Sequence, residues 1–223
     1  MARARTVLVA GATGLVGREI LRSLSTDDSV AAVHCLVRRP VAPSPPAHPK
    51  VTFHTVDFTA LPALPAADEV YIALGTTIRD AGSEAAFRAV DLDAVAATAV
   101  AARAAGASRC GLVTAMGADT GSRIFYSRVK GEAEAAVRAA GFEQLVVARP
   151  SMLIVEGSRT ALGQRERAGE KLVTPLMRLA APLIPANYRA VSPVDVARKL
   201  LATVPVVVNG FTVLLSGDLQ PRS

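Results

Sequence analysis

The sequence predicts an α/β fold: a doubly wound parallel sheet with helices on both faces. Short and almost wholly apolar runs alternate along the chain with segments of helical period, which is typical of parallel strands buried on both sides. A glycine-rich turn joins the first apolar run to the first helix. At 223 residues and 51% hydrophobic, the chain is long enough for one core with a small appended lobe.

The predicted elements follow from apolar periodicity and from the residues that end each one. The expected strands are the runs 6–10, 32–37, 51–56, 68–74, 109–114 and 144–148. The expected helices cover 15–24, 83–105 and 122–140. Ser83 is the expected N-cap of the second helix, and Gly106 and Gly141 end the second and third. The stretch 40–49 holds five prolines, so we expect a surface loop there instead of a crossover helix.

The pattern changes at about Ser151. Residues 156–170 are polar and Arg-rich, and 172–183 are apolar but interrupted by prolines. A helix capped by Ser192 then runs through Leu201, and a last strand covers 211–215. We therefore predict a core of residues 1–150 and a small C-terminal lobe of residues 151–223 over the carboxyl edge of the sheet, within one structural domain overall.

Composition argues against several classes of protein. The formal charge is +6, but the basic residues are scattered and aromatics make up only 4% of the chain, which disfavours nucleic-acid binding. No run of about 18 uncharged apolar residues predicts a membrane span. No leader-like segment precedes the first strand, and Cys35 and Cys110 lie in apolar runs, so we expect buried thiols and a cytoplasmic protein.

Gly11, Gly14 and Gly17 lie between the first strand and the first helix. In such a turn the first glycine reverses the chain, the second lets backbone amides approach a phosphate, and the third allows close packing of helix on strand. The helix N-terminus then offers free N–H groups and partial positive charge to an anion. The spacing departs from the commoner G-x-G-x-x-G, and three glycines near a helix can also be plain turn chemistry.

Tyr126 and Lys130 form the second signal, because residues four apart share one face of a helix. A tyrosine is a poor acid or base at neutral pH, since its ordinary pKa is about 10. A neighbouring ammonium stabilises the phenolate and lowers that pKa. The pair falls on the helix after the fifth strand, where it could reach a nicotinamide ring.

In order and spacing these motifs resemble the short-chain dehydrogenase/reductase superfamily, a group with a Rossmann fold. The similarity is greatest to its atypical branch of small proteins similar to the Tat-interacting protein. The segments that carry the resemblance are 11–17, 36–40, 73–78, 125–132 and 148–151. The resemblance implies an oxidoreductase that binds NADP(H) and reduces a small carbonyl substrate. A homodimer through the helices 83–105 and 122–140 is implied by the resemblance alone.

The same resemblance assigns roles to single residues. Tyr126 is expected to be the general acid or base and Lys130 its electrostatic partner, which also holds the cofactor ribose. Thr114 would orient the carbonyl in place of the family's usual Ser, although a strand-end Thr can equally be packing. The cofactor is expected to contact Gly11, Thr13, Gly14, Leu15 and Val16 at its pyrophosphate, Arg38 and Arg39 at a 2′-phosphate, Asp57 and Phe58 at the adenine, Leu74, Gly75 and Thr76 at the adenosine ribose and phosphates, and Pro150 and Ser151 near the nicotinamide.

The two arginines also have a direct physical reading. An NAD site favours an acidic residue about 20 positions beyond the glycines, whereas Arg38 and Arg39 occupy that place here. Guanidinium groups bind phosphate bidentately, so the sequence predicts NADPH over NAD. The alternative is two surface arginines at a strand end.

Other chemistry-bearing residues give weaker signals. The Asn that classical members use in a proton relay has no counterpart, since Asp91 occupies its place. Two acid pairs, Asp91/Asp93 and Glu132/Glu134, lie two apart in helices and are interpreted as solvated charges. His34, His48 and His54 lack metal-ligand spacing, so no metal is predicted. The arginines between 159 and 178 either line an anionic substrate pocket or form a solvated surface.

Two functions from different classes remain open. The first is an NADPH-dependent reductase that acts on a small molecule, either neutral or anionic. The second is an NADPH-binding regulatory or scaffold protein with little turnover, because one fold hosts different functions. A nucleotide-sugar epimerase or dehydratase is a third option, for which the tail looks too small.

Overall fold

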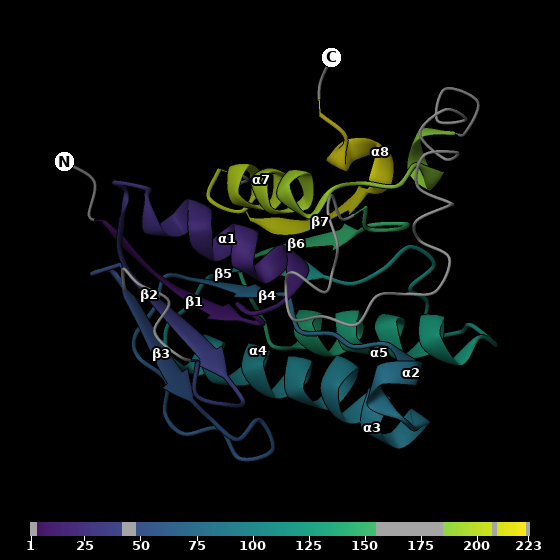
Figure 1. Cartoon of the computed structure of the whole chain (residues 1–223), viewed down its shortest axis with the longest axis horizontal. Helices are drawn as coiled ribbons and strands as arrows, with labels where there is room; N and C mark the ends of the chain where they lie inside the picture. Colours follow the sequence, from purple (N-terminus) through teal and green to yellow (C-terminus); the bar gives the residue numbers. More distant parts are fainter. Residues whose placement is uncertain (1–3, 42–47, 155–184, 207–208, 222–223) are drawn as a thin grey trace.

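One seven-stranded sheet organises the chain, with all neighbouring strands parallel and in the order β3-β2-β1-β4-β5-β6-β7 (Figure 1). The computed structural model describes residues 4–41, 48–154, 185–206 and 209–221. The strands are β1 (Arg5–Ala10), β2 (Val30–Val37), β3 (Val51–Thr55), β4 (Glu69–Ile72), β5 (Arg109–Val113), β6 (Gln144–Arg149) and β7 (Gly210–Leu215). The predicted doubly wound parallel sheet is confirmed.

Helices cover both faces of this sheet (Figure 1). α1 (Leu15–Ser25) and α7 (Pro193–Thr203) pack together on one face, and α4 (Ala94–Ala104) and α5 (Phe125–Ala139) on the other. The shorter elements are α2 (Ile78–Ala81), α3 (Glu84–Arg88), the π-helical turn η1 (Ala89–Asp93), the 3-10 turn η4 (Ala186–Tyr188) and α8 (Ser216–Leu219). Each face buries its own apolar cluster, one under α1 and α7 and the other under α4 and α5.

The strand order reverses beside β1, which pairs with β2 on one side and β4 on the other. The connections from these strands therefore diverge at their carboxyl ends, and such a point of reversal is where open α/β sheets bind ligands. The predicted proline loop between β2 and β3 agrees with the structure in its described parts, 38–41 and 48–50, which contain no helix.

The helix predicted over 83–105 is not continuous. Ser83 caps its start, accepting a hydrogen bond from the Ala86 amide at 3.1 Å, and Gly106 follows its end with φ +99°. Between them, η1 separates α3 from α4. The alanine-rich sequence gave no sign of this break, because a π turn keeps helical composition while adding one residue to the turn.

The tail beyond Ser151 contributes to the core itself. β7 extends the sheet beside β6, and α7 packs against α1. Ser192 caps α7 as predicted, accepting from the Asp195 amide at 3.1 Å. These parts do not form a lobe separate from the sheet. The predicted lobe segments within 155–184 lie outside the described residues.

A buried charge cluster closes the amino edge of the sheet. Glu69, fully buried on β4, lies 3.0 Å from Arg109 Nη1 and 3.6 Å from Arg5 Nε, and it accepts a hydrogen bond from the Tyr71 hydroxyl at 3.1 Å. Burial raises the pKa of Glu69, and the two arginines only partly offset this.

The two cysteines are buried and unpaired, as predicted. Burial raises the pKa of the Cys35 thiol to about 12 and also raises that of Cys110. Both thiols therefore stay protonated near neutral pH and pack as small apolar groups.

Candidate functional site

Two of the three glycines after β1 are required by the chain's own packing. Gly11 has φ +90°, and a Cβ there would lie 2.4 Å from the Ala73 carbonyl oxygen. A Cβ on Gly17 would lie 2.0 Å from the Gly11 carbonyl oxygen. No side chain fits at such distances, so these residues allow β1, α1 and the segment after β4 to approach one another.

Gly14 is different, because a Cβ there would meet its nearest protein atom, the Gly11 oxygen, at 3.3 Å. Gly14 is the N-cap of α1 and supplies no side-chain cap, and the first turn contains no acidic residue. The amides at this helix start are thus left available to an acceptor from outside, and the partial positive charge is not neutralised locally. A diphosphate matches both features.

The predicted adenosine-binding residues lie at the carboxyl ends of neighbouring strands. Arg38 and Arg39 are exposed directly after β2. The exposed Asp57 carboxylate accepts hydrogen bonds from the Thr59 amide and hydroxyl at 2.9 and 2.7 Å, which lowers its pKa. The Phe58 side chain is buried in the apolar cluster under α4 and α5.

The remaining predicted cofactor residues are spread around the same edge. Thr13 is exposed, Leu15 is half-buried and Val16 is buried under α1. Leu74, Gly75 and Thr76 follow β4, and Pro150 and Ser151 follow β6.

Ser151 is tied to the tail by hydrogen bonds from both its amide and its hydroxyl. Its amide donates to Ser216 Oγ at 2.7 Å, and its hydroxyl donates to the Arg189 carbonyl oxygen at 2.8 Å. These bonds hold the segment after β6 against α8.

Tyr126 and Lys130 lie on one face of α5, as their spacing predicts. The Tyr126 ring is half-buried and packs on Phe87, with ring centres 5.5 Å apart. Lys130 is buried, and its Nζ lies 6.0 Å from the centre of the Tyr126 ring. The lysine is thus near enough to act electrostatically on the phenol.

Asp91 is not a solvated helix charge, and that prediction was wrong. It is fully buried on η1, where Oδ1 lies 2.6 Å from Lys130 Nζ and Oδ2 accepts a hydrogen bond from the Thr76 amide at 2.8 Å. Burial raises the pKa of Asp91, and Lys130 opposes that rise. Asp93, two residues further on, is exposed as expected.

Glu134 was also predicted to be a solvated charge, and this prediction was wrong because the residue is buried. Its carboxylate accepts a hydrogen bond from the Thr114 hydroxyl at 2.6 Å and from Arg149 Nε at 2.9 Å. The single proton of the Thr114 hydroxyl is therefore donated within the protein. Glu132 is half-exposed and pairs with Arg88 at 2.7 Å.

The burial of Asp91 and Glu134 was not predicted, because the two-residue spacing within each acid pair does not show which other elements the acids contact. A signal was present: Tyr126, Lys130 and Glu134 recur every four residues and so share one helix face. His34 and His54, for which no metal was predicted, contact each other at 3.0 Å between β2 and β3. No group of three potential metal ligands occurs within the described ranges.

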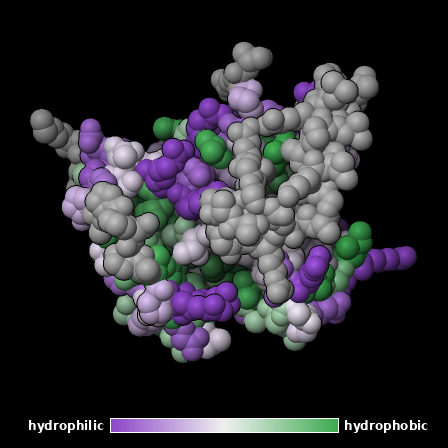
Figure 2. Space-filling view, viewed as in Figure 1, coloured by the Kyte–Doolittle hydropathy of each residue, from purple (hydrophilic) through white to green (hydrophobic). Residues whose placement is uncertain are grey.

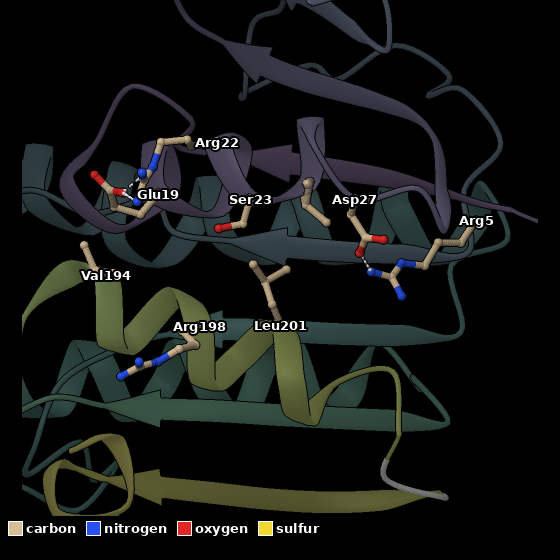
Figure 3. A pocket seen from close by; sticks show the side chains of 9 residues that line it. Arg5, Glu19, Arg22, Ser23, Asp27, Val194, Arg198 and Leu201 are labelled. Carbon is tan, nitrogen blue, oxygen red and sulfur yellow. Dashed lines mark hydrogen bonds and ion pairs between the residues drawn. The ribbon is translucent and has the colours of Figure 1, made fainter. Parts of the chain in front are cut away.

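A hollow between α1 and α7, of about 270 Å³, lies apart from this site (Figure 3). Its arginines are paired with acids: Arg22 with Glu19 at 2.9 Å and Arg5 with Asp27 at 2.8 Å. Hydrophilic side chains gather over α1 on this face of the molecule (Figure 2). Leu24, Val194 and Leu201 also line this hollow, and its paired arginines leave it without a marked charge for a ligand.

Comparison with known families gives one match, described as NAD(P)H-binding, over residues 11–176. Among curated proteins, the rat protein HTATIP2 is 33% identical over 164 residues, which is 72% of this chain and 67% of that protein. The mitochondrial protein FMP52 of Eremothecium gossypii is 35% identical over 150 residues, 67% of this chain and 66% of its own length. The matched part thus spans about two thirds of these relatives.

Solved structures show the same fold at low sequence identity. MoeE5 in complex with UDP-glucose and NAD has a TM-score of 0.68 at 18% identity, covering 94% of this chain and 75% of that one. The oxidoreductase ylbE from Lactococcus lactis has a TM-score of 0.61 at 19% identity, covering 96% and 94%. At the described positions, none of the helices is long and apolar enough to cross a membrane.

Proposed function

The chain belongs to the NAD(P)H-binding family, in the atypical short-chain dehydrogenase/reductase branch of HTATIP2 and FMP52, and on that premise we propose that it is an NADPH-dependent oxidoreductase. Its substrate is a small carbonyl compound, and Tyr126 is the general acid. The observation that carries the proposal is the Tyr126–Lys130 pair on α5, at the same sheet edge as the open N-terminus of α1.

The residues present are suited to a dinucleotide. The amides at the start of α1 would bind the pyrophosphate, with Gly14 allowing its close approach. Lys130 would hold the ribose next to the nicotinamide. Bound NADPH supplies the hydride, and the chain supplies orientation, charge and a proton.

Tyr126 would donate its phenolic proton to the alkoxide oxygen that develops on the substrate. Its ring is fixed by Phe87, so the hydroxyl is held in one direction. The Lys130 ammonium, 6.0 Å from the ring centre, stabilises the phenolate left after the transfer. The proton is then replaced from solvent, which reaches the half-exposed ring.

Replacing Tyr126 with Phe tests the assignment. Turnover of a carbonyl panel with NADPH should fall by about two to four orders of magnitude, the usual contribution of a general acid. NADPH affinity should stay within about twofold, because the phenyl ring preserves the packing on Phe87. Ser122→Ala, on the loop before α5, is the matched control. Unchanged turnover in the Phe variant would exclude Tyr126 as the acid.

A second function is favoured by one observation, the donation of the Thr114 hydroxyl to Glu134. With that proton engaged, Thr114 lacks a donor for a substrate carbonyl. An NADPH-binding regulatory protein with little turnover would not need one. Stoichiometric NADPH binding without oxidation across the carbonyl panel would support this alternative.

The cellular location stays a prediction. The sequence favoured the cytoplasm, whereas the FMP52 relatives are named as mitochondrial.

A further inference from the structure

Asp91 differs from the other buried acids in that its partner is the lysine of the catalytic pair. Its carboxylate lies 2.6 Å from Lys130 Nζ, with the two side chains 0% and 7% exposed. We propose that Asp91 is a positioning residue of this site: it neutralises the Lys130 ammonium, fixes it beside Thr76, and thereby sets how readily Tyr126 ionises. Its part in catalysis rests on the proposed function, but its effect on Tyr126 can be measured without cofactor.

Three segments meet at this carboxylate. Asp91 lies on η1, Lys130 lies on α5, and the Thr76 amide that donates to Oδ2 at 2.8 Å follows β4. A Cβ on Gly75 would lie 3.4 Å from Asp91 Oδ1 and 3.5 Å from Lys130 Nζ, so this loop's backbone passes directly against the ion pair. The pair therefore connects the predicted ribose-binding loop with the helix that carries Tyr126.

The π turn helps to place Asp91 there. Such turns insert one residue into a helix and are frequent at functional sites. The Asp91 side chain meets α5, whereas Asp93 on the same turn is exposed. These two acids, two residues apart, thus provide a test residue and its control.

The electrostatic consequence follows from the net charge of the pair. An isolated ammonium near a phenol lowers the phenol's pKa by stabilising the phenolate. With Asp91 bound to it, Lys130 presents a dipole to Tyr126 instead of a full positive charge. Removing the Asp91 charge should therefore leave Lys130 a stronger stabiliser of the Tyr126 phenolate.

Several other charged groups around α5 are engaged elsewhere, and Arg123, before the helix, is exposed. Arg88 pairs with Glu132 at 2.7 Å, and Arg149 binds Glu134. Arg128 lies over the Phe125 ring at 5.9 Å, and the exposed Asp119 acts on Arg149. The pair facing the Tyr126 ring is Lys130 with Asp91.

The composition of the chain allows a direct measurement, because it has no Trp and only three Tyr. Absorbance near 295 nm reports tyrosinate, and subtracting the curve of the matching Tyr126→Phe protein isolates Tyr126. Tyr71 is buried with a strongly raised pKa, and Tyr188 is exposed, so neither changes between the paired curves.

In cofactor-free protein, Asp91→Asn should lower the Tyr126 midpoint by about one pH unit, and Asp93→Asn should leave it unchanged. An unchanged or raised midpoint in Asp91→Asn would overturn the proposal. A protein that shows the shift but binds no NADPH would refute the proposed function and retain this inference.

A second measurement applies if Asp91→Asn does not fold. Lys130→Met leaves the Asp91 carboxylate buried without its cation, and should lower the melting temperature markedly. Adding Asp91→Asn to that variant removes the unpaired charge and should recover part of the loss. A double variant less stable than Lys130→Met alone would contradict the coupling.

Discussion

Buried charge clusters lie at both edges of the sheet, but they differ in whether a reactive side chain beside them is exposed. At the amino edge, Glu69 forms ion pairs with Arg5 and Arg109 and accepts a hydrogen bond from the Tyr71 hydroxyl. At the carboxyl edge, Asp91 binds Lys130, and Lys130 also faces the ring of the half-exposed Tyr126. Burial raises the pKa of the acid in both clusters. A buried ion pair is thus not by itself a sign of function: an adjacent exposed reactive group is what distinguishes the carboxyl edge.

The largest effect that tests this contrast is expected from Glu69→Ala. Removal of the buried acid leaves the Tyr71 hydroxyl without its acceptor and Arg109 without its counter-charge, whereas Arg5 keeps Asp27 at 2.8 Å. Because both arginines are partly exposed, we expect a loss near the lower limit for broken buried pairs, about 3 kcal/mol in the free energy of unfolding. Chemical denaturation measures this loss.

The same variant should leave NADPH affinity unchanged at temperatures where it is folded, because the amino edge is away from the glycine turn. Asp28→Ala, which removes an exposed acid before β2, is the control and should change neither quantity. Reduced NADPH affinity in folded Glu69→Ala would show that the two edges are coupled.

A smaller effect is expected from Arg38→Ala and Arg39→Ala. These variants should weaken cofactor binding and leave stability nearly unchanged. Both side chains are exposed after β2, so stability should change by less than about 0.5 kcal/mol. Loss of a charge-assisted contact to a 2′-phosphate should weaken NADPH binding roughly tenfold to a hundredfold while NADH binding stays constant. Titration of both nucleotides checks this. Equal affinity of the unmodified protein for both would remove the case for NADPH.

The difference between the edges also shows what sequence alone could reveal. The strands, the glycine turn and the Tyr126–Lys130 spacing are local patterns, and local patterns predicted them. The burial of Asp91 and Glu134 depends on partners contributed by other elements: Lys130 on α5 for Asp91, and Thr114 and Arg149 for Glu134. An acid is buried only where such a partner compensates it, and no pattern around the acid itself names that partner.

The break at η1 was unpredictable for a related reason. Ala89 to Asp93 has the composition of an ordinary helix, and the wider turn packs against α5, a contact that local sequence does not reveal. The contact of Phe58 with the adenine stays a prediction from the resemblance; its ring packs in the apolar cluster under α4 and α5.

The smallest predicted effect concerns the pH dependence of stability. At both edges, the contribution of the buried acid to stability should decrease as the pH rises. Because burial raises the pKa of Glu69 above its ordinary value of 4.5, the folded protein holds this proton more tightly than the unfolded chain. The stabilisation is present at low pH and is lost as the pH rises through the folded pKa. Glu69→Gln has no such proton, so its melting temperature should rise relative to the unmodified protein as the pH increases above 4.5. Asp91→Asn should show the same trend, since burial is also the main cause of its raised pKa, yet only Asp91→Asn should shift the Tyr126 titration. If the melting temperature of Glu69→Gln instead falls relative to the unmodified protein as the pH rises, the arginines lower the pKa of Glu69 more than burial raises it. The sign predicted for the amino edge would then be wrong.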